Sequence, residues 1–178
     1  RTAAALPHLP SPEACAYLAG APEAAAAGEA PCMVAPGVDD SANGAELEEA
    51  LAAIGLEAPS DLQPIGRALA AVVLLGNVRF DALDDAGSAV SSDTRDALEV
   101  AAEALSLEAD ALARGMTERR STIRGELMVS PRPPDAAAAA RDALAKALFG
   151  GLFARLVTRI NVELDPRALG GAGGDANV

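Results

Sequence analysis

The run "DAAAAARDALAKALFGGLFARLVTRINVEL" (135–164) constrains the fold of this chain most strongly. Alanine and leucine favour helix, so the run predicts one helix roughly 43 Å long at 1.5 Å per residue. Its second half is apolar around most of its circumference, with Lys146, Arg155 and Arg159 as the exceptions. We therefore expect this helix to pack on several sides, within this chain or against a missing neighbour.

Further helices are predicted upstream. "AELEEALAAIGL" carries Leu47, Leu51 and Ile54 on one face. "APSDLQPIGRALAAVVLLGN" should form a central, buried helix that begins with a capping box of Ser60 and Gln63. "TRDALEVAAEALSL" and "EADALARGM" predict two short helices. The fold class is therefore mainly α, a helical bundle with one small β-hairpin between the last short helix and the long C-terminal helix.

The remaining segments are predicted to be less regular. Residues 1–44 form a loop-rich start with one short helix near Ser11, and "GVDDSANG" (37–44) has the composition of a turn. The segment 81–94 is expected to be an acidic surface loop. Residues 45–164 form the helical unit, and 165–178, rich in glycine, are expected to be a disordered tail.

The stretch "RSTIRGELMVSPRPP" (120–134) interrupts the helices with a β-like alternation around Gly125 and then reaches three prolines. Residues 114–132 contain five arginines and two glutamates, a local charge of +3 that leaves −15 on the rest of a chain with net charge −12. This basic island is expected either to meet an acidic surface or to pair with acidic helices nearby. The overall charge argues against nucleic acid and anionic membranes as partners.

No catalytic, cofactor-binding or metal-binding residues are predicted. His8, Cys15 and Cys32 are too few for a zinc or thiol site, and Asp39–Asp40 and Asp84–Asp85 are typical of solvated turns. "GGAGG" lacks the lysine of a phosphate loop. Without a membrane-spanning stretch or signal peptide, an intracellular, soluble protein is expected. Because residue 1 is Arg, the chain is expected to be processed or part of something longer.

Three segments, read in order, and a fourth that precedes them resemble the myosin motor domain. "GRALAAVVLLGNVRF" resembles the family's "ILHLGNIxF", and "TRDALEVAAEALSLEADALARGMTERRSTIRGELMVSP" is similar to the paired helices and "TRGE" hairpin that follow. "ARDALAKALFGGLFARLVTRINVEL" resembles "ARDALAKALYxRLFxWLVxxIN", and "GVDDSANGAELEEALAAIGL" is similar to "GVDDxxxFxxxxxAMxxIG". The resemblance covers about residues 32–164 and implies the helical upper fifty-kilodalton subdomain beside the actin-binding cleft.

The resemblance implies a part of a motor and not a complete one. The family's phosphate loop, switch I and switch II are missing here, so ATP and Mg would bind elsewhere in a parent myosin ATPase, and this segment would bind no cofactor. The implied partners are filamentous actin and the remainder of the motor, in a cytoplasmic, cytoskeletal myosin complex. The alternative is a non-enzymatic helical interaction module, or a degenerate relic of a myosin.

The resemblance also implies actin-binding residues in the hairpin, the element called the cardiomyopathy loop in this family. They are Arg120, Ile123, Arg124, Gly125, Glu126, Leu127 and Arg132. The family carries an acidic or phosphorylatable residue sixteen positions before the Asp of "DALAK", here Asp142, which makes Glu126 the regulatory charge position. Asp81, Asp84 and Asp85 fall in a loop that would be a secondary actin-facing element.

Two departures from the family pattern lie in the helices. Leu74 replaces the histidine before "LGN", and Gly150 and Gly151 replace helix-favouring or polar residues. Each glycine costs roughly 0.5–1 kcal/mol relative to alanine inside a helix, which is expected to soften the long helix.

Overall fold

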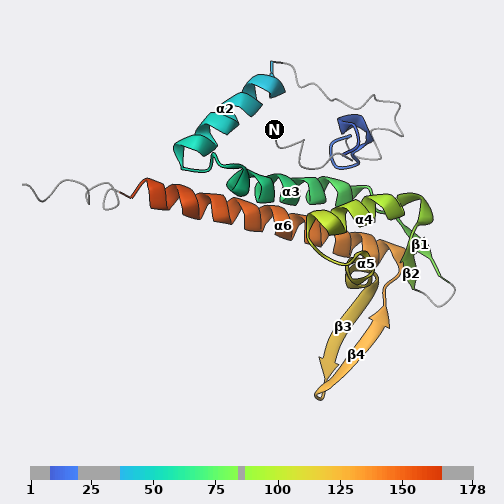
Figure 1. Cartoon of the computed structure of the whole chain (residues 1–178). Coiled ribbons are helices and arrows are strands. Elements are labelled where there is room, and N and C mark those ends of the chain that lie inside the picture. Colours follow the sequence, from blue (N-terminus) through green and yellow to red (C-terminus); the bar gives the residue numbers. More distant parts are fainter. Residues whose placement is uncertain (1–8, 20–36, 84–86, 166–178) are drawn as a thin grey trace, which may run out of the picture.

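The computed structural model describes residues 9–19, 37–83 and 87–165, and the fold is mainly α (Figure 1). Its helices and strands are the 3-10 helix η2 (Pro12–Ala14), α2 (Asp40–Ala53), α3 (Pro59–Gly76), β1 (Phe80–Ala82), β2 (Ser88–Val90), the 3-10 helix η3 (Ser92–Thr94), α4 (Arg95–Ala104), α5 (Ala109–Thr117), β3 (Glu118–Ile123), β4 (Glu126–Pro131) and α6 (Pro134–Glu163). The predicted fold class is confirmed, including the hairpin that precedes the long helix.

The core lies where α3 packs between α4 and α6 (Figure 1). Its largest fully buried side chains are those of Leu75, Val78, Leu98 and Met116. Alanine fills the remaining contacts and lets the helix backbones approach closely; the buried alanines of α3, α4 and α6 are Ala70, Ala71, Ala101, Ala102, Ala104, Ala137 and Ala145. The prediction of a central buried helix in this region is confirmed.

The start of α3 differs from the prediction. Ser60 and Gln63 do not form a capping box: Ala58 occupies the N-cap position and makes no side-chain cap hydrogen bond. Pro59 stands in the first turn, where its fixed φ favours helix and its missing N–H leaves no donor unsatisfied. Proline therefore starts this helix, and Ser60 already lies inside it.

Two segments expected to be irregular have regular structure. The helix α2 begins at Asp40, inside the predicted turn, because the Asp39 side chain accepts hydrogen bonds from the backbone N–H groups of Ser41 and Ala42 at 3.0 and 3.1 Å. The acidic segment 81–94 contains an antiparallel pair, with Phe80 opposite Val90 and Ala82 opposite Ser88. The predicted tail beyond residue 165 lies outside the described residues.

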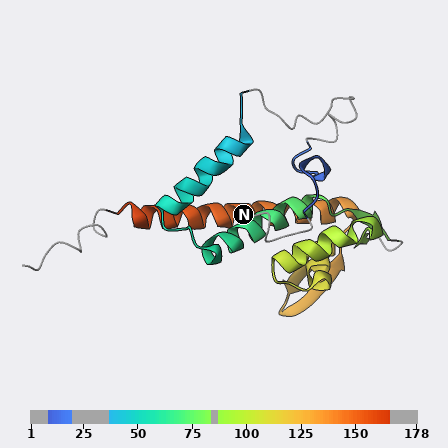
Figure 2. The same cartoon turned by 45° about the horizontal axis from the view of Figure 1, so that its top comes forward.

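The helix α6 runs unbroken for 30 residues, through both Gly150 and Gly151 (Figure 2). Pro134 stands in its first turn, so the prolines after the hairpin begin the long helix as well as ending β4. The C-terminal half of α6 is poorly covered: Phe149 and Phe153 are 54% and 63% exposed. Among the helices described, none is both long and apolar enough to cross a membrane.

Candidate functional site

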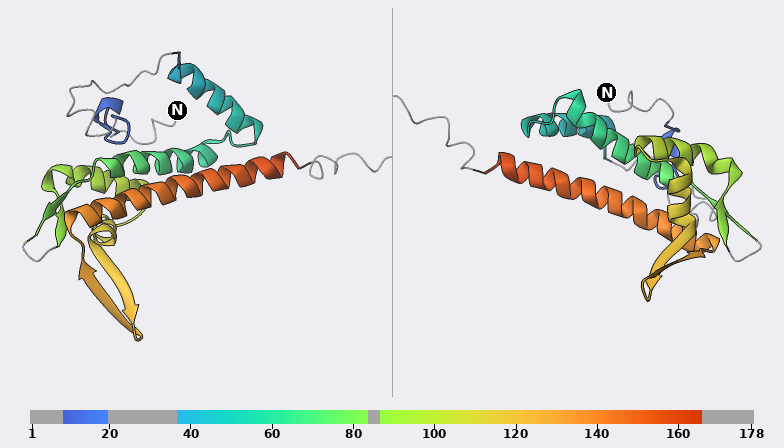
Figure 3. Two further views of the ribbon diagram at one scale, coloured as in Figure 1. Left: turned by 180° about the vertical axis from the view of Figure 1, so that it is seen from behind. Right: turned by 60° about the horizontal axis from the view of Figure 1, so that its bottom comes forward.

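The hairpin β3–β4 projects away from the helical body (Figures 1 and 3). Its strands pair from Glu118 opposite Pro131 to Ile123 opposite Glu126, so only two residues form the turn. Arg124 and Gly125 both have positive φ, 54° and 87°, as a two-residue turn of the primed type requires. The sequence therefore predicted the hairpin and its tip correctly.

The register divides the hairpin into two faces, because side chains alternate along each strand and opposed residues share a side. We call one the Leu127 face; it carries Arg120, Thr122, Leu127 and Val129. The other, the Glu126 face, carries Arg119, Ser121, Glu126 and Met128. The predicted contact residues thus separate: Arg120 and Leu127 share a face, Glu126 and its cross-strand partner Ile123 stand at the opposite one, and Arg124 and Gly125 form the tip.

Strand β4 is exposed over its whole length. Leu127, Met128 and Val129 are 66%, 50% and 52% exposed, so both faces present apolar side chains to the surroundings. A two-stranded hairpin without a covered face is marginally stable by itself. Three adjacent exposed apolar residues on such an element indicate a surface that is completed by contact with a partner.

Arg132 lies at the base of the hairpin, where it joins three elements. Its Nη1 donates to the carbonyl oxygens of Gly115 and Met116 at 3.0 and 2.9 Å, at the C-terminal end of α5. Its backbone N–H donates to the Thr117 oxygen at 2.7 Å, and its own carbonyl accepts from Ser88 Oγ at 2.8 Å. A cation is favourable at the negative end of a helix, so Arg132 anchors the hairpin to α5 and to β2.

The other basic residues of the hairpin have few partners. In the described part of the chain, the one ion pair of the hairpin joins Arg120 to Glu118 at 3.7 Å, within β3 itself. Arg114, Glu118, Arg120 and Arg132 line a shallow groove of about 390 Å³ between α5 and the hairpin. No ion pair joins the arginines of the hairpin to a described helix, which leaves the basic island available to an acidic surface.

The proposed secondary loop is described only in part. Asp81 is exposed on β1, whereas Asp84 and Asp85 lie outside the described residues. Leu83 beside them is also exposed. The strands β1 and β2 contact the start of α6, so this short hairpin and the longer one emerge from the same end of the molecule (Figure 1).

Sequence reasoning did not anticipate the contacts of Tyr17. Its hydroxyl donates to Asp142 Oδ1, although the two residues are 125 positions apart, and the Arg141 guanidinium lies 5.8 Å from its ring centre. The ring packs on Gly76, where an added Cβ would come within 2.7 Å of it. Gly76 belongs to the "LGN" segment and Asp142 to the "RDALAKAL" segment, so two motifs of the resemblance meet at one tyrosine.

Further bonds complete this junction around Tyr17. Asn77 Oδ1 accepts from the Ala16 N–H at 2.8 Å and its Nδ2 donates to the Ala14 oxygen at 2.9 Å. Arg141 Nη1 donates to the Val78 oxygen at 2.7 Å. Burial and the hydrogen bond to Asp142 raise the pKa of Tyr17 to about 12. Burial acts to raise the pKa of Asp142, but the bonds from Tyr17 and Arg141 outweigh it and lower this pKa.

The described residues hold no group of three or more His, Cys, Asp and Glu side chains that could bind a metal ion. Cys15 is a buried free thiol whose Sγ contacts the Ser11 oxygen at 3.4 Å, and burial raises the pKa of this thiol. His8 and Cys32 fall outside the described residues.

Comparison with known proteins identifies the family. The family model for the myosin head (motor domain) matches residues 11–170. A Myosin-1 of Malassezia globosa is 34% identical over 165 residues, which are 90% of this chain and 12% of that protein. A Myosin-1 of Mycosarcoma maydis is 34% identical over 164 residues, and a Myosin-5 of Arabidopsis thaliana is 33% identical over 141 residues.

The chain spans about an eighth of the length of the first two relatives, 12% in each. The matched region nevertheless includes almost all of the described structure, from η2 to the end of α6. This chain belongs to the myosin head (motor domain) family.

Proposed function

We propose that this chain is the upper cleft subdomain of an ATP-driven, actin-based motor and that the hairpin β3–β4 contacts filamentous actin. The nucleotide site, with ATP and Mg, lies in other parts of the parent protein. The observation that carries the proposal is the projecting hairpin, whose second strand is exposed at every residue in a member of the myosin head family. Apolar side chains flanked by arginines suit an acidic protein surface that also offers apolar contacts.

The two faces have different roles in this proposal. A flat partner surface contacts one face of a hairpin together with its tip, and the Leu127 face offers two exposed apolar side chains, Leu127 and Val129, beside a cation, Arg120. Leu127, Val129 and Arg120 therefore bind actin with the tip residues Arg124 and Gly125. Arg132 holds the hairpin in position through α5.

Glu126 supplies the charge at the regulatory position. A glutamate at this position supplies an acidic group without a kinase, so the site needs no phosphorylation. Glu126 lies on the face opposite Leu127, at the first residue of β4. In this position Glu126 places an acidic group next to the tip and leaves the apolar side chains of the Leu127 face free to contact the partner.

Co-sedimentation of the 178-residue chain with filamentous actin tests the proposal. We expect the wild type to pellet with actin, and Leu127→Ser with Val129→Ser to abolish pelleting. The matched control is Met128→Ser on the Glu126 face, which removes a similarly exposed apolar side chain and should retain binding. Equal loss in both variants would contradict the assignment of faces, and no pelleting of the folded wild type would contradict actin binding by this chain.

A non-enzymatic interaction module is the second candidate, and the exposed apolar stripe on α6 favours a protein partner of some kind. The two candidates differ in the parent sequence. A motor requires a phosphate loop and switch I upstream of this region and switch II downstream of it. Extending the reading frame in both directions distinguishes them, because a parent without these segments cannot hydrolyse ATP in the manner of a motor.

A further inference from the structure

The helix α2 has almost no contact with the rest of the described chain. Residues 40–50 are all exposed, and α2 contains no buried residue. It approaches the body only at its C-terminal end and rises away from α3 and α6 toward its start (Figures 1 and 2). The tether at that end is a hydrogen bond from Arg159 Nε of α6 to the carbonyl oxygen of Ile54, at 3.2 Å.

An apolar stripe on α2 faces no partner over half of its length. Leu47, Leu51 and Ile54 follow the i, i+4, i+7 spacing of one helical face. Ile54 and Leu51, near the tether, are half-buried, whereas Leu47, further out, is 56% exposed. Glu46, Glu48 and Glu49 lie off this stripe, so covering it would leave their charges in water.

A second unpartnered stripe lies on α6 and shows the same gradient. Phe149, Phe153, Val157 and Ile160 share one side of the helix. Ile160 is half-buried near the tether, Val157 is 37% exposed, and Phe153 and Phe149 are more exposed still. Both stripes are thus partly covered where the helices meet and bare where they diverge.

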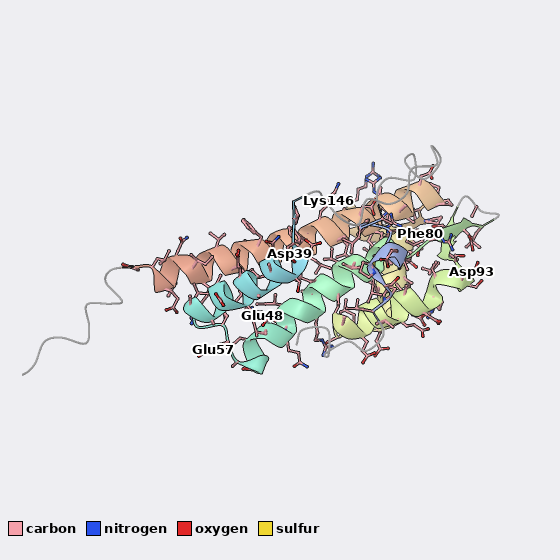
Figure 4. The ribbon with its side chains drawn as sticks, turned by 90° about the horizontal axis from the view of Figure 1, so that it is seen from above. Asp39, Glu48, Glu57, Phe80, Asp93 and Lys146 are labelled. Atoms are coloured by element: carbon pink, nitrogen blue, oxygen red, sulfur yellow. The ribbon has the colours of Figure 1, made fainter. Side chains whose placement is uncertain are left out.

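The Arg159–Ile54 hydrogen bond determines which residues of the two stripes would face each other. Figure 4 shows α2, which begins after Asp39, running in the same direction as α6. Leu47 precedes Ile54 by seven residues and Phe153 precedes Ile160 by seven, which is about 10.5 Å along each helix. If the helices close about the Arg159–Ile54 contact, Leu47 comes opposite Phe153 and Leu51 opposite Val157.

The hinge for this movement lies between the cap that ends α2 and the start of α3. Gly55 has a φ of 72°, a conformation that glycine adopts without strain, and ends the helix. An added Cβ there would lie 3.0 Å from the Arg159 guanidinium, so a side chain would press on the tether. The Leu56 N–H returns to the Leu51 oxygen and the Gly55 N–H to the Ala52 oxygen, both at 2.9 Å, so Gly55 and Leu56 move with α2 and the pivot lies in residues 57–58, before α3 begins at Pro59.

We propose that α2 is a flap, hinged between Leu56 and Pro59, that closes on α6 and buries Leu47 and Leu51 against Phe153 and Val157. The open arrangement exposes a groove between the two stripes, and the closed one removes both stripes from water. Burial of facing apolar side chains favours closure, because it removes apolar area from water. Lys146 and Asp40 stand seven residues before Phe153 and Leu47, so in this register their opposite charges face each other. This flap does not depend on actin binding by the hairpin.

Disulfide crosslinking of the full 178-residue chain tests the flap. In a background of Cys15→Ala and Cys32→Ala, Leu47→Cys is combined with Phe153→Cys and oxidised in dilute solution. A disulfide requires Cα atoms within about 7 Å, which only the closed flap provides. The control pairs Phe153→Cys with Glu49→Cys, on the opposite side of α2. We expect an intramolecular crosslink in the first pair and its loss in the control.

Equal crosslinking in both pairs, or none in either, would overturn the proposal. Crosslinks only between molecules would assign the stripe to a second copy and would also overturn it. Circular dichroism checks that each variant is folded. Should the cysteine pair prevent folding, spin labels at Glu48 and Lys146, both exposed and both shown in Figure 4, give a second measurement. One short distance between the two spin labels supports closure, and one long distance between them contradicts it.

Discussion

Tyr17 connects the N-terminal segment to the two helices that carry the core. It is the only tyrosine in a chain without tryptophan, so its ionisation can be followed directly by ultraviolet absorbance. Its pKa is raised because burial disfavours the charged phenolate and because the hydroxyl donates to Asp142. The carboxylate of Asp142 is in turn held ionised by Tyr17 and by Arg141.

We predict that the folded chain titrates its tyrosine near pH 12 instead of pH 10. A raised pKa in the folded state means that this contribution to stability is complete below pH 10 and is lost as the pH rises toward 12. Asp142→Asn should bring the midpoint back toward 10, since it removes the charged acceptor. A wild-type midpoint at 10 under folding conditions would show that Tyr17 does not dock as described.

Gly76 is the second residue on which this junction depends. A Cβ at this position would lie 2.7 Å from Cδ2 and 2.8 Å from Cγ of Tyr17, too close for a rigid ring to tolerate. We predict that Gly76→Ala lowers the free energy of unfolding by about 1–3 kcal/mol, as overpacking usually does. Denaturant unfolding measures this change.

The matched control for Gly76 is Gly150→Ala in α6, where an added Cβ meets nothing within 4 Å. Here the substitution should raise the free energy of unfolding by about 0.5–1 kcal/mol, because alanine favours helix. Destabilisation by both substitutions would show that the loss at Gly76 does not come from its contact with Tyr17. A neutral Gly76→Ala would mean that the N-terminal segment can leave α3 at little cost.

At the scale of elements, the hairpin was predictable because its information is local. Alternation and the Arg124–Gly125 dipeptide determine strand, turn and register within a few residues. The helix that follows was equally clear, from the prolines before it and the alanines within it. What could not be read locally was the division of the contact residues between two faces, which required the register.

We predict that the turn tolerates Arg124→Asn and not Gly125→Val. Arginine at a φ of 54° costs roughly 1–2 kcal/mol, whereas asparagine adopts this region more readily, so Arg124→Asn should leave the hairpin at least as stable. A β-branched residue at a φ of 87° should disrupt the turn. Amide exchange across Thr122–Leu127 measures both effects, and equal protection in the two variants would contradict the turn geometry.

Elsewhere, local patterns misled or fell short for physical reasons. Pro59 stands in the first turn of α3, so Ser60 is not the cap that was expected. The Asp39 cap starts α2 at Asp40, where a turn was expected. The strands β1 and β2 have three residues each, too short for a period to be visible in the sequence. The Tyr17–Asp142 contact depends on the fold as a whole, and nothing in either local sequence predicts it.

At the scale of the whole molecule, the apolar stripe on α6 should promote association. We predict that the isolated chain self-associates reversibly as its concentration rises, in competition with closure of the flap over the same stripe, and that Phe149→Ser with Phe153→Ser reduces this association. Arg155→Ser, also on the exposed surface of α6, is the control and should leave association unchanged. Sedimentation velocity measures the effect; a monomeric wild type at all concentrations would contradict it.

Co-sedimentation with filamentous actin is the measurement that decides whether the hairpin of this motor-family subdomain binds actin. The most informative comparison adds Glu126→Arg to the wild type, because this change reverses the charge at the regulatory position while β4 keeps its pairing. The folded wild-type chain should pellet with actin, and Glu126→Arg should change the fraction bound. Failure of both folded proteins to pellet at any actin concentration would contradict actin binding by the hairpin.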